Sequence, residues 1–148
     1  MIAVDTNILV YAQAGEGDDA RHQMALRLVY DLTISGAIIP VQVFGEFSNV
    51  CVRKLGMGPQ KVIDQLADYR WMFETPQTTL DHILAATTLA SAHRLQFFDA
   101  LIITVAASSG ATMLLSEDMQ DGLQVKELIV LNPFNPANAA VIAEQLAP

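Results

Sequence analysis

The fold class of this chain is indicated by its opening stretch, Ile2-Ala3-Val4-Asp5-Thr6-Asn7-Ile8-Leu9. A short apolar run that ends at an acidic residue is typical of a buried strand whose carboxyl end carries that acid. A short helix is expected over residues 7–13, directly after this strand. We therefore expect Asp5 at the carboxyl-terminal edge of a strand within a central sheet.

Similar short apolar runs recur along the chain, and segments with helical periodicity separate them. Strands are expected at residues 37–39, 112–115 and 129–131, and helices at residues 20–35, 41–55, 58–72, 79–94, 98–109 and 135–146. Asp18 or Asp19 is expected to cap the first of these helices. Apolar strands without strict alternation, separated by helices, are typical of a parallel sheet covered on both faces. We predict an α/β fold with three layers, α/β/α, around a central parallel sheet of four to five short strands.

Length and composition define the broad class of the protein. The chain has 148 residues, which is a common size for one domain, and we expect a single domain over residues 1–148. The hydrophobic fraction of 52% excludes intrinsic disorder. The longest uncharged stretch, residues 100–116, is shorter than the roughly 20 apolar residues of a membrane span. With Cys51 as the single cysteine and no basic segment at the start, we expect a cytoplasmic protein without membrane contact.

The charges of the chain are few and mostly negative. Eight lysine and arginine residues stand against sixteen aspartate and glutamate residues, so the formal net charge is −8 at pH 7. This balance argues against a protein that binds nucleic acid through a broad basic face. An excess of carboxylates has a second use, because several of them together can bind a divalent cation.

Four acidic residues lie beside strongly apolar segments. Asp5 and Asp118 each follow a predicted strand, and α/β sheets bind their ligands at the carboxyl ends of the strands. Asp99 stands at the start of a predicted helix, where the simpler role is a helix cap. Glu46 lies among apolar neighbours in another helix, where the simpler role is a polar stripe facing solvent.

If these four carboxylates converge, they need a positive partner. Convergent carboxylates without a counter-ion repel one another and raise one another's pKa. Mg²⁺ and Mn²⁺ prefer oxygen ligands and would remove this repulsion. The three histidines and the single cysteine lack the paired spacing of a zinc site. The sequence thus favours a magnesium or manganese site over a zinc site.

Four motifs of this sequence resemble the motifs of the PIN-domain ribonucleases. They are Val4-Asp5-Thr6-Asn7-Ile8-Leu9, Pro40-Val41-Gln42-Val43-Phe44-Gly45-Glu46, Phe98-Asp99-Ala100-Leu101-Ile102 and Leu114-Leu115-Ser116-Glu117-Asp118-Met119-Gln120-Asp121. They follow the order and spacing of that family over residues 2–121. Within the family, the chain most resembles the VapC-type toxins of type II toxin–antitoxin pairs.

The resemblance implies a metal-dependent endoribonuclease that hydrolyses RNA phosphodiester bonds. In that reading Asp5, Asp99 and Asp118 bind Mg²⁺ or Mn²⁺, and Glu46 is a further catalytic acid that positions the attacking water. The products would carry a 5′-phosphate and a 3′-hydroxyl group.

The supporting residues follow less directly from the motifs. Small polar residues beside the acids are candidates for orienting them, or serve as turn and capping residues: Thr6, Asn7 and Ser116. The last motif contains two additional acids, Glu117 and Asp121. We expect Asp118 to be the main acid of this motif, assisted by Asp121.

The expected macromolecular partners follow from the resemblance and from the acidity of the chain. RNA must be held by few cations, and the candidates that flank the acids are Arg53, Lys54 and Arg94. The alternative role of these three residues is solvated surface charge. A VapC-type protein implies a homodimer and a small antitoxin, and a basic antitoxin segment would fit an acidic cleft.

Other functions remain open at this point. A phosphoryl-transfer domain of the haloacid-dehalogenase type expects Asp-x-Asp, and Asn7 occupies the place of its second acid. A receiver-like domain expects a lysine after a late strand, whereas Lys126 precedes the last predicted strand. A solitary PIN-domain nuclease in RNA processing and a non-catalytic scaffold are further alternatives.

Overall fold

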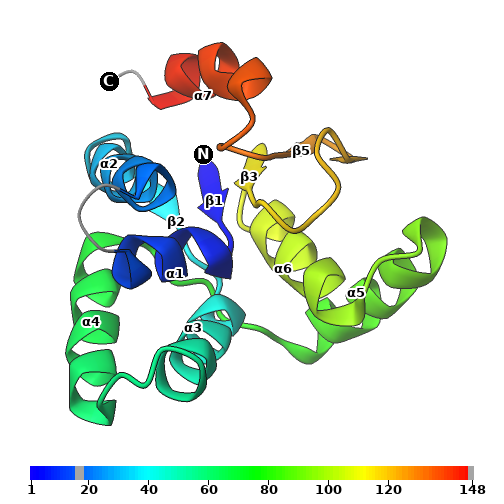
Figure 1. Ribbon diagram of the computed structural model, residues 1–148. Helices are drawn as coiled ribbons and strands as arrows, with labels where there is room; N and C mark the ends of the chain where they lie inside the picture. The colour runs from blue at the N-terminus through cyan, green and yellow to red at the C-terminus, as the bar shows by residue number, and fades with distance from the viewer. Residues whose placement is uncertain (16–18, 147–148) are drawn as a thin grey trace.

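A five-stranded sheet forms the centre of the molecule (Figure 1). The computed structural model describes residues 1–15 and 19–146. The strands are β1 (Ile2–Val4), β2 (Ala37–Ile38), β3 (Met113–Leu115), β4 (Gln124–Val125) and β5 (Leu128–Leu131), in the order β2-β1-β3-β5-β4. All neighbouring strands are parallel except β4, which pairs antiparallel with β5. The predicted central parallel sheet is confirmed, but the prediction lacked the antiparallel edge strand β4.

Helices lie on both sides of this sheet, and the predicted α/β class is confirmed (Figure 1). They are α1 (Thr6–Ala14), α2 (Ala20–Ser35), α3 (Val41–Arg53), α4 (Pro59–Met72), α5 (Leu80–His93), α6 (Phe97–Ser108) and α7 (Ala139–Leu146). A short 3-10 helix, η1 (Pro136–Asn138), precedes α7, so the predicted last helix is divided in two. Within residues 1–15 and 19–146, the structure contains no helix with the length and apolarity needed to span a membrane.

The pairing of β1 with β3 places the ends of these two strands side by side. Val4 stands opposite Leu115, and the Asp5 N–H donates to the Leu115 carbonyl oxygen at 3.0 Å. The next residues, Asp5 and Ser116, therefore leave the sheet at the same edge. Because parallel strands carry their ligands at this edge, the register fixes where functional side chains can gather.

Helix α3 combines a buried face with a polar one. It buries Val43, Phe47 and Cys51, which are spaced four residues apart on one face of a helix. Phe47 lies edge-on to Tyr69 of α4, with 5.6 Å between the ring centroids. This packing fixes α3 against the core. The neighbouring face of α3, which carries Glu46, is not among the buried residues of the helix.

Helix α2 begins with a side-chain cap. The Asp19 carboxylate accepts a hydrogen bond from the Arg21 N–H at 3.0 Å, so Asp19 is a cap as predicted. Asp18, the other predicted cap, lies outside the described residues. The cap fixes the backbone from which the Arg21 side chain extends.

Candidate functional site

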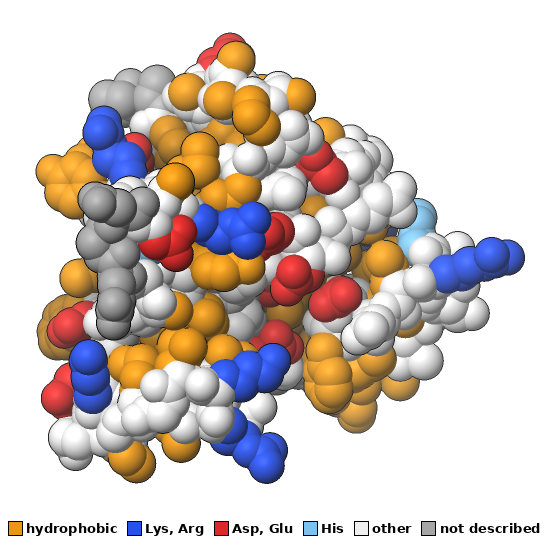
Figure 2. All heavy atoms as spheres, in the orientation of Figure 1, with side chains coloured by type: hydrophobic (Ala, Val, Ile, Leu, Met, Phe, Trp, Pro, Cys, Tyr) orange, Lys and Arg blue, Asp and Glu red, His pale blue; other side chains and the backbone are white. Residues whose placement is uncertain are grey.

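The four predicted acids line one cavity of about 420 Å³ at the carboxyl ends of β1 and β3. They come from distant parts of the chain: Asp5, Glu46, Asp99 and Asp118. Figure 2 shows acidic side chains gathered near the middle of this face, with lysine and arginine side chains to either side. The sheet and the helices that follow its strands thus bring together residues that are more than a hundred positions apart.

Asp5 is the most buried of these acids, with 5% of its surface exposed. One carboxylate oxygen accepts the Thr6 N–H at 2.7 Å, and the other accepts the Ser116 hydroxyl at 2.6 Å. Burial raises the pKa of Asp5 to about 6, the nearby Glu46 and Asp99 add to the increase, and the two hydrogen bonds oppose it. Asp5 is therefore held in place by its neighbours but poorly stabilised as an anion.

Glu46 is half-buried and hydrogen-bonded through both of its carboxylate oxygens. Oε2 accepts the Thr6 hydroxyl at 3.0 Å, and Oε1 accepts the Gln42 side-chain amide at 3.0 Å. Thr6 thereby links two acids, because its N–H donates to Asp5 and its hydroxyl to Glu46. Gln42 was not among the predicted site residues, although its position one helical turn before Glu46 was a usable signal.

Asp99 and Asp118 complete the acidic lining. Gln96 occupies the cap position of α6, and Asp99 lies in the first turn of that helix. Burial raises the pKa of Asp99, and the charges of Glu46 and Asp118 raise it further. Asp118 is exposed and lies in the loop that follows β3. Asp99 is thus not the N-cap of α6, and the Gln96 side chain at that position makes no capping hydrogen bond.

Within residues 1–15 and 19–146, none of these four carboxylates forms an ion pair, although Lys54 lines the same cavity. The two ion pairs in this part of the chain join Arg21 to Glu117 and Arg27 to Asp31. In the described part of the chain, no group of three or more acidic, histidine or cysteine side chains is already arranged to hold a metal ion. Mg²⁺ often takes only one or two carboxylates and keeps several waters. An open cavity with four carboxylates and an excess of negative charge therefore fits such an ion.

The supporting residues predicted from the motifs lie in two places. Thr6 and Ser116 bond to the acids directly, and Asn7 lines the cavity and accepts the Glu117 N–H at 3.4 Å. Asp121 does not line the cavity; it lies in the loop between β3 and β4 and bonds to the segment before α7. Its carboxylate accepts hydrogen bonds from three asparagines: Asn132 N–H at 2.9 Å and the side-chain amides of Asn135 and Asn138 at 2.8 Å each.

The predicted RNA-contacting cations are also divided. Lys54 lines the cavity at the end of α3, whereas Arg53 and Arg94 are exposed and do not line it. Tyr11 lines the cavity and Arg21 lies over its ring. Neither of these two residues was predicted, because their proximity to the acids arises from packing between α1 and α2, which no motif spacing encodes.

Comparison with known protein families identifies the type of domain. Residues 2–120 match the model of the PIN domain. This chain belongs to the PIN-domain family. The match contains all four acids of the cavity, and a comparison with curated proteins gave no match.

Solved structures with the same fold include VapC toxins and toxin–antitoxin complexes. VapC20 from Mycobacterium tuberculosis, a toxin that cleaves the sarcin–ricin loop, is 24% identical with a TM-score of 0.62, over 77% of this chain and 87% of that chain. A toxin–antitoxin complex from Klebsiella pneumoniae is 19% identical with a TM-score of 0.68, over 90% of this chain and 98% of that chain. VapBC2 from Rickettsia felis, bound to a DNA fragment from its promoter, is 19% identical with a TM-score of 0.64, over 89% of this chain and 98% of that chain. At these identities the likeness establishes the fold.

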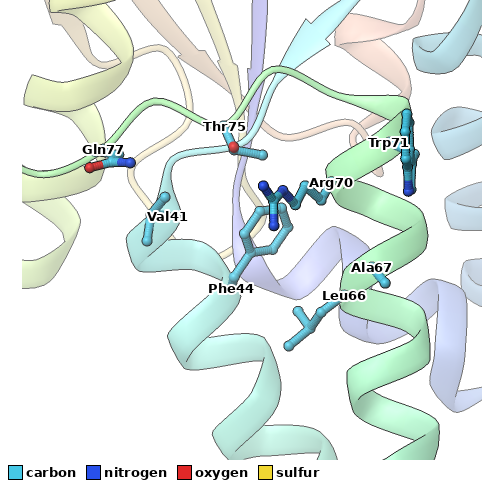
Figure 3. A pocket seen from close by; sticks show the side chains of 8 residues that line it. All are labelled: Val41, Phe44, Leu66, Ala67, Arg70, Trp71, Thr75 and Gln77. Atoms are coloured by element: carbon cyan, nitrogen blue, oxygen red, sulfur yellow. The ribbon is translucent and has the colours of Figure 1, made fainter.

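A larger hollow of this PIN domain lies away from the acids, between α3 and α4. It measures about 900 Å³, and Figure 3 shows the side chains that line it: Val41, Phe44, Leu66, Ala67, Arg70, Trp71, Thr75 and Gln77. It contains no carboxylate, and Trp71 at its edge is 91% exposed. The smaller, acidic cavity is therefore the one of the two that carboxylates line.

Proposed function

We propose that this PIN domain is a metal-dependent endoribonuclease, the toxin of a VapBC-type toxin–antitoxin pair. The observation that carries this proposal is the cavity lined by four carboxylates, none of which forms an ion pair in the described part of the chain. The family match and the toxin structures that share the fold support the same conclusion. We further propose that residues 1–148 form one such domain.

In this proposal Asp5, Asp99 and Asp118 bind Mg²⁺ or Mn²⁺. A divalent ion held there would lower the pKa of a water molecule and would offset the charge that develops on the phosphate. Ser116 and Thr6 hold Asp5 through one hydrogen bond to each oxygen, and each carboxylate oxygen has a further lone pair for a ligand. These two residues therefore orient Asp5 without blocking it.

Glu46 has the role of positioning the attacking water. The hydrogen bonds from Thr6 and Gln42 fix the direction of its carboxylate, and each oxygen retains a lone pair for a water proton. Water attacks the phosphorus, and the bond from phosphorus to the 3′-oxygen breaks. The products are a 5′-phosphate and a 3′-hydroxyl group.

RNA and antitoxin binding are proposed from charge. Lys54 is the lining residue that can contact a phosphate, and Arg53 and Arg94 are more distant candidates. An antitoxin with a basic segment complements a chain of net charge −8. A cytoplasmic homodimer completes the proposal, and apolar side chains that α5 exposes, among them Leu80 and Leu84, are compatible with a second copy.

Metal removal is expected to abolish RNA cleavage. The purified protein in excess EDTA should leave a single-stranded RNA intact, and Mg²⁺ or Mn²⁺ added beyond the chelator should restore cleavage, because the carboxylates alone do not activate water. Gel analysis of end-labelled RNA measures the rate and the product ends. Full cleavage in EDTA would contradict the proposed mechanism. Asp99→Asn is the control for a contaminating nuclease, because this variant should stay inactive when metal is present.

The toxin role has its own test. Expression of the chain from a controlled promoter is expected to arrest bacterial growth, and coexpression of a small protein encoded beside it should relieve the arrest. Colony counts measure both effects, with Asp99→Asn as the inactive control. Active RNA cleavage in vitro without growth arrest would instead favour a solitary nuclease in RNA processing.

A further inference from the structure

The motif after β3 contains an acid that the proposed mechanism does not use. Three consecutive side chains of this loop take different directions: Ser116 bonds to Asp5, Glu117 pairs with Arg21, and Asp118 lines the cavity. Glu117 and Asp118 are chemically similar and adjacent in sequence. The structure therefore keeps the Glu117 and Asp118 carboxylates apart.

A cluster of four residues holds Glu117 away from Asp118. We call it the Arg21 clasp, and it consists of Tyr11, Arg21, Glu117 and Phe134. Arg21 Nη2 lies 3.0 Å from Glu117 Oε1, and Arg21 Nη1 donates to the Tyr11 hydroxyl at 3.5 Å. The guanidinium carbon lies 5.1 Å from the ring centroid of Tyr11 and 5.4 Å from that of Phe134. Two aromatic rings and one carboxylate thus hold a single guanidinium group, a combination that suits arginine better than lysine.

The clasp holds Glu117 beside residues that line the cavity. Tyr11 and Asn7 line the cavity, and Asn7 accepts the Glu117 N–H. The Glu117 carboxylate raises the pKa of the Tyr11 phenol, chiefly by accepting a hydrogen bond from it. The side chain of Glu117 is 17% exposed, and its Oε2 is buried without a hydrogen-bond partner in the described residues.

Glu117 therefore depends on Arg21 for its position. A mostly buried carboxylate without a cation is strongly unfavourable. Without the guanidinium group, Glu117 would turn toward solvent or toward a metal ion, and the cavity lies next to it. Arg21 itself is held from the other side, because Asp19 caps its N–H.

We propose that Arg21 is a positioning residue that withholds Glu117 from the metal, so that Asp118 alone serves from this loop. The inference rests on the proposed function, because it requires that the acidic cavity binds a divalent ion. It predicts that removal of Arg21 adds a competing carboxylate to the site. Metal would then bind more tightly but in an unproductive arrangement.

The test compares Arg21→Gln, Glu117→Gln and the double variant of the full chain. Arg21→Gln is expected to bind Mn²⁺ about tenfold more tightly by isothermal titration calorimetry and to lose about tenfold in kcat at saturating metal, with KM for RNA little changed. Glu117→Gln should behave like the wild type, and adding Glu117→Gln to Arg21→Gln should return both quantities toward wild-type values. Arg27→Gln is the matched control, because Arg27 lies on the same helix and pairs with Asp31 away from the cavity.

Other outcomes overturn the inference. If the clasp were only structural, Arg21→Gln and Glu117→Gln would lose activity alike and Mn²⁺ binding would weaken in both, with a lower melting temperature. A rise in KM alone, unaffected by Glu117→Gln, would make Arg21 an RNA contact instead. A wild-type chain that neither binds Mn²⁺ nor cleaves RNA overturns the proposed function and the inference with it. Wild-type binding and cleavage with no change in Arg21→Gln overturns the inference alone.

Discussion

Asp5→Asn is expected to reduce metal-dependent RNA cleavage by about a thousandfold, since several kcal/mol of metal-derived stabilisation convert to roughly that factor in rate. Asparagine has nearly the shape of aspartate and can still accept the Thr6 N–H that Asp5 accepts now. The substitution therefore removes a charge that we propose binds the metal, with little change in packing. Initial rates with labelled RNA at saturating Mg²⁺ measure the loss, and activity near the wild-type level would remove Asp5 from the mechanism.

The same substitution is expected to stabilise the metal-free protein above pH 6. The pKa of Asp5 is raised from 3.8 to about 6 in the folded state. The folded state therefore binds this proton more tightly than the unfolded chain. The resulting stabilisation is complete below pH 3.8 and is lost as the pH rises through 6. The shift corresponds to about 3 kcal/mol of folding free energy for the ionised group.

Urea unfolding in EDTA at pH 5 and pH 8 measures this effect. The wild type should lose stability between the two pH values through Asp5, and Asp5→Asn should lack that part of the loss. Asp64→Asn, at an exposed position of α4, is the control for removing a negative charge. A lower stability of Asp5→Asn at pH 8 would show that the hydrogen bonds of the carboxylate outweigh its burial.

Asp118→Asn and Asp121→Asn are expected to have opposite effects. Asp118 is exposed and lines the cavity, so its loss should reduce cleavage by about a hundredfold and change stability by less than about 0.5 kcal/mol. Asp121 instead holds Asn132, Asn135 and Asn138, so its loss should leave cleavage intact and lower stability by about 1 kcal/mol. Cleavage rates and urea midpoints of the two variants measure this contrast.

The contrast also has a pH dependence. The hydrogen bonds from Asn132 and Asn135 hold the pKa of Asp121 below its usual value. Its contribution to stability is therefore present above pH 3.8 and is lost as the pH falls through the lowered pKa. Equal losses of cleavage in the two variants would contradict the assignment and would make Asp121 a second catalytic acid.

The sequence predicted those features that depend on local patterns. Apolar runs located β1, β3 and β5, and the acids that follow β1 and β3 were expected at one edge of the sheet. Strand β4 has two residues, of which only Val125 is buried, so no alternating pattern marked it. It exists because it pairs with β5 after a short turn, which is a tertiary effect.

The candidate site shows the same division between local pattern and contact through space. Asp5, Glu46, Asp99 and Asp118 were expected from motifs, and the structure places all four at one cavity. A supporting role for Asp121 was expected because it is an additional acid of the last motif. In the structure its carboxylate bonds to asparagines of a segment that carries no motif.

The register of β1 and β3 has a consequence for the timing of activity during synthesis. Ser116 Oγ donates to Asp5 Oδ2 across 111 positions of the chain, and Asp118 follows two residues later. Asp5 is synthesised well before Ser116, yet its position is fixed only after β3 has been made and has paired with β1. A nascent chain therefore has no assembled acidic site until β3 has left the ribosome. Until then, the ribosome that makes the proposed nuclease is protected from it.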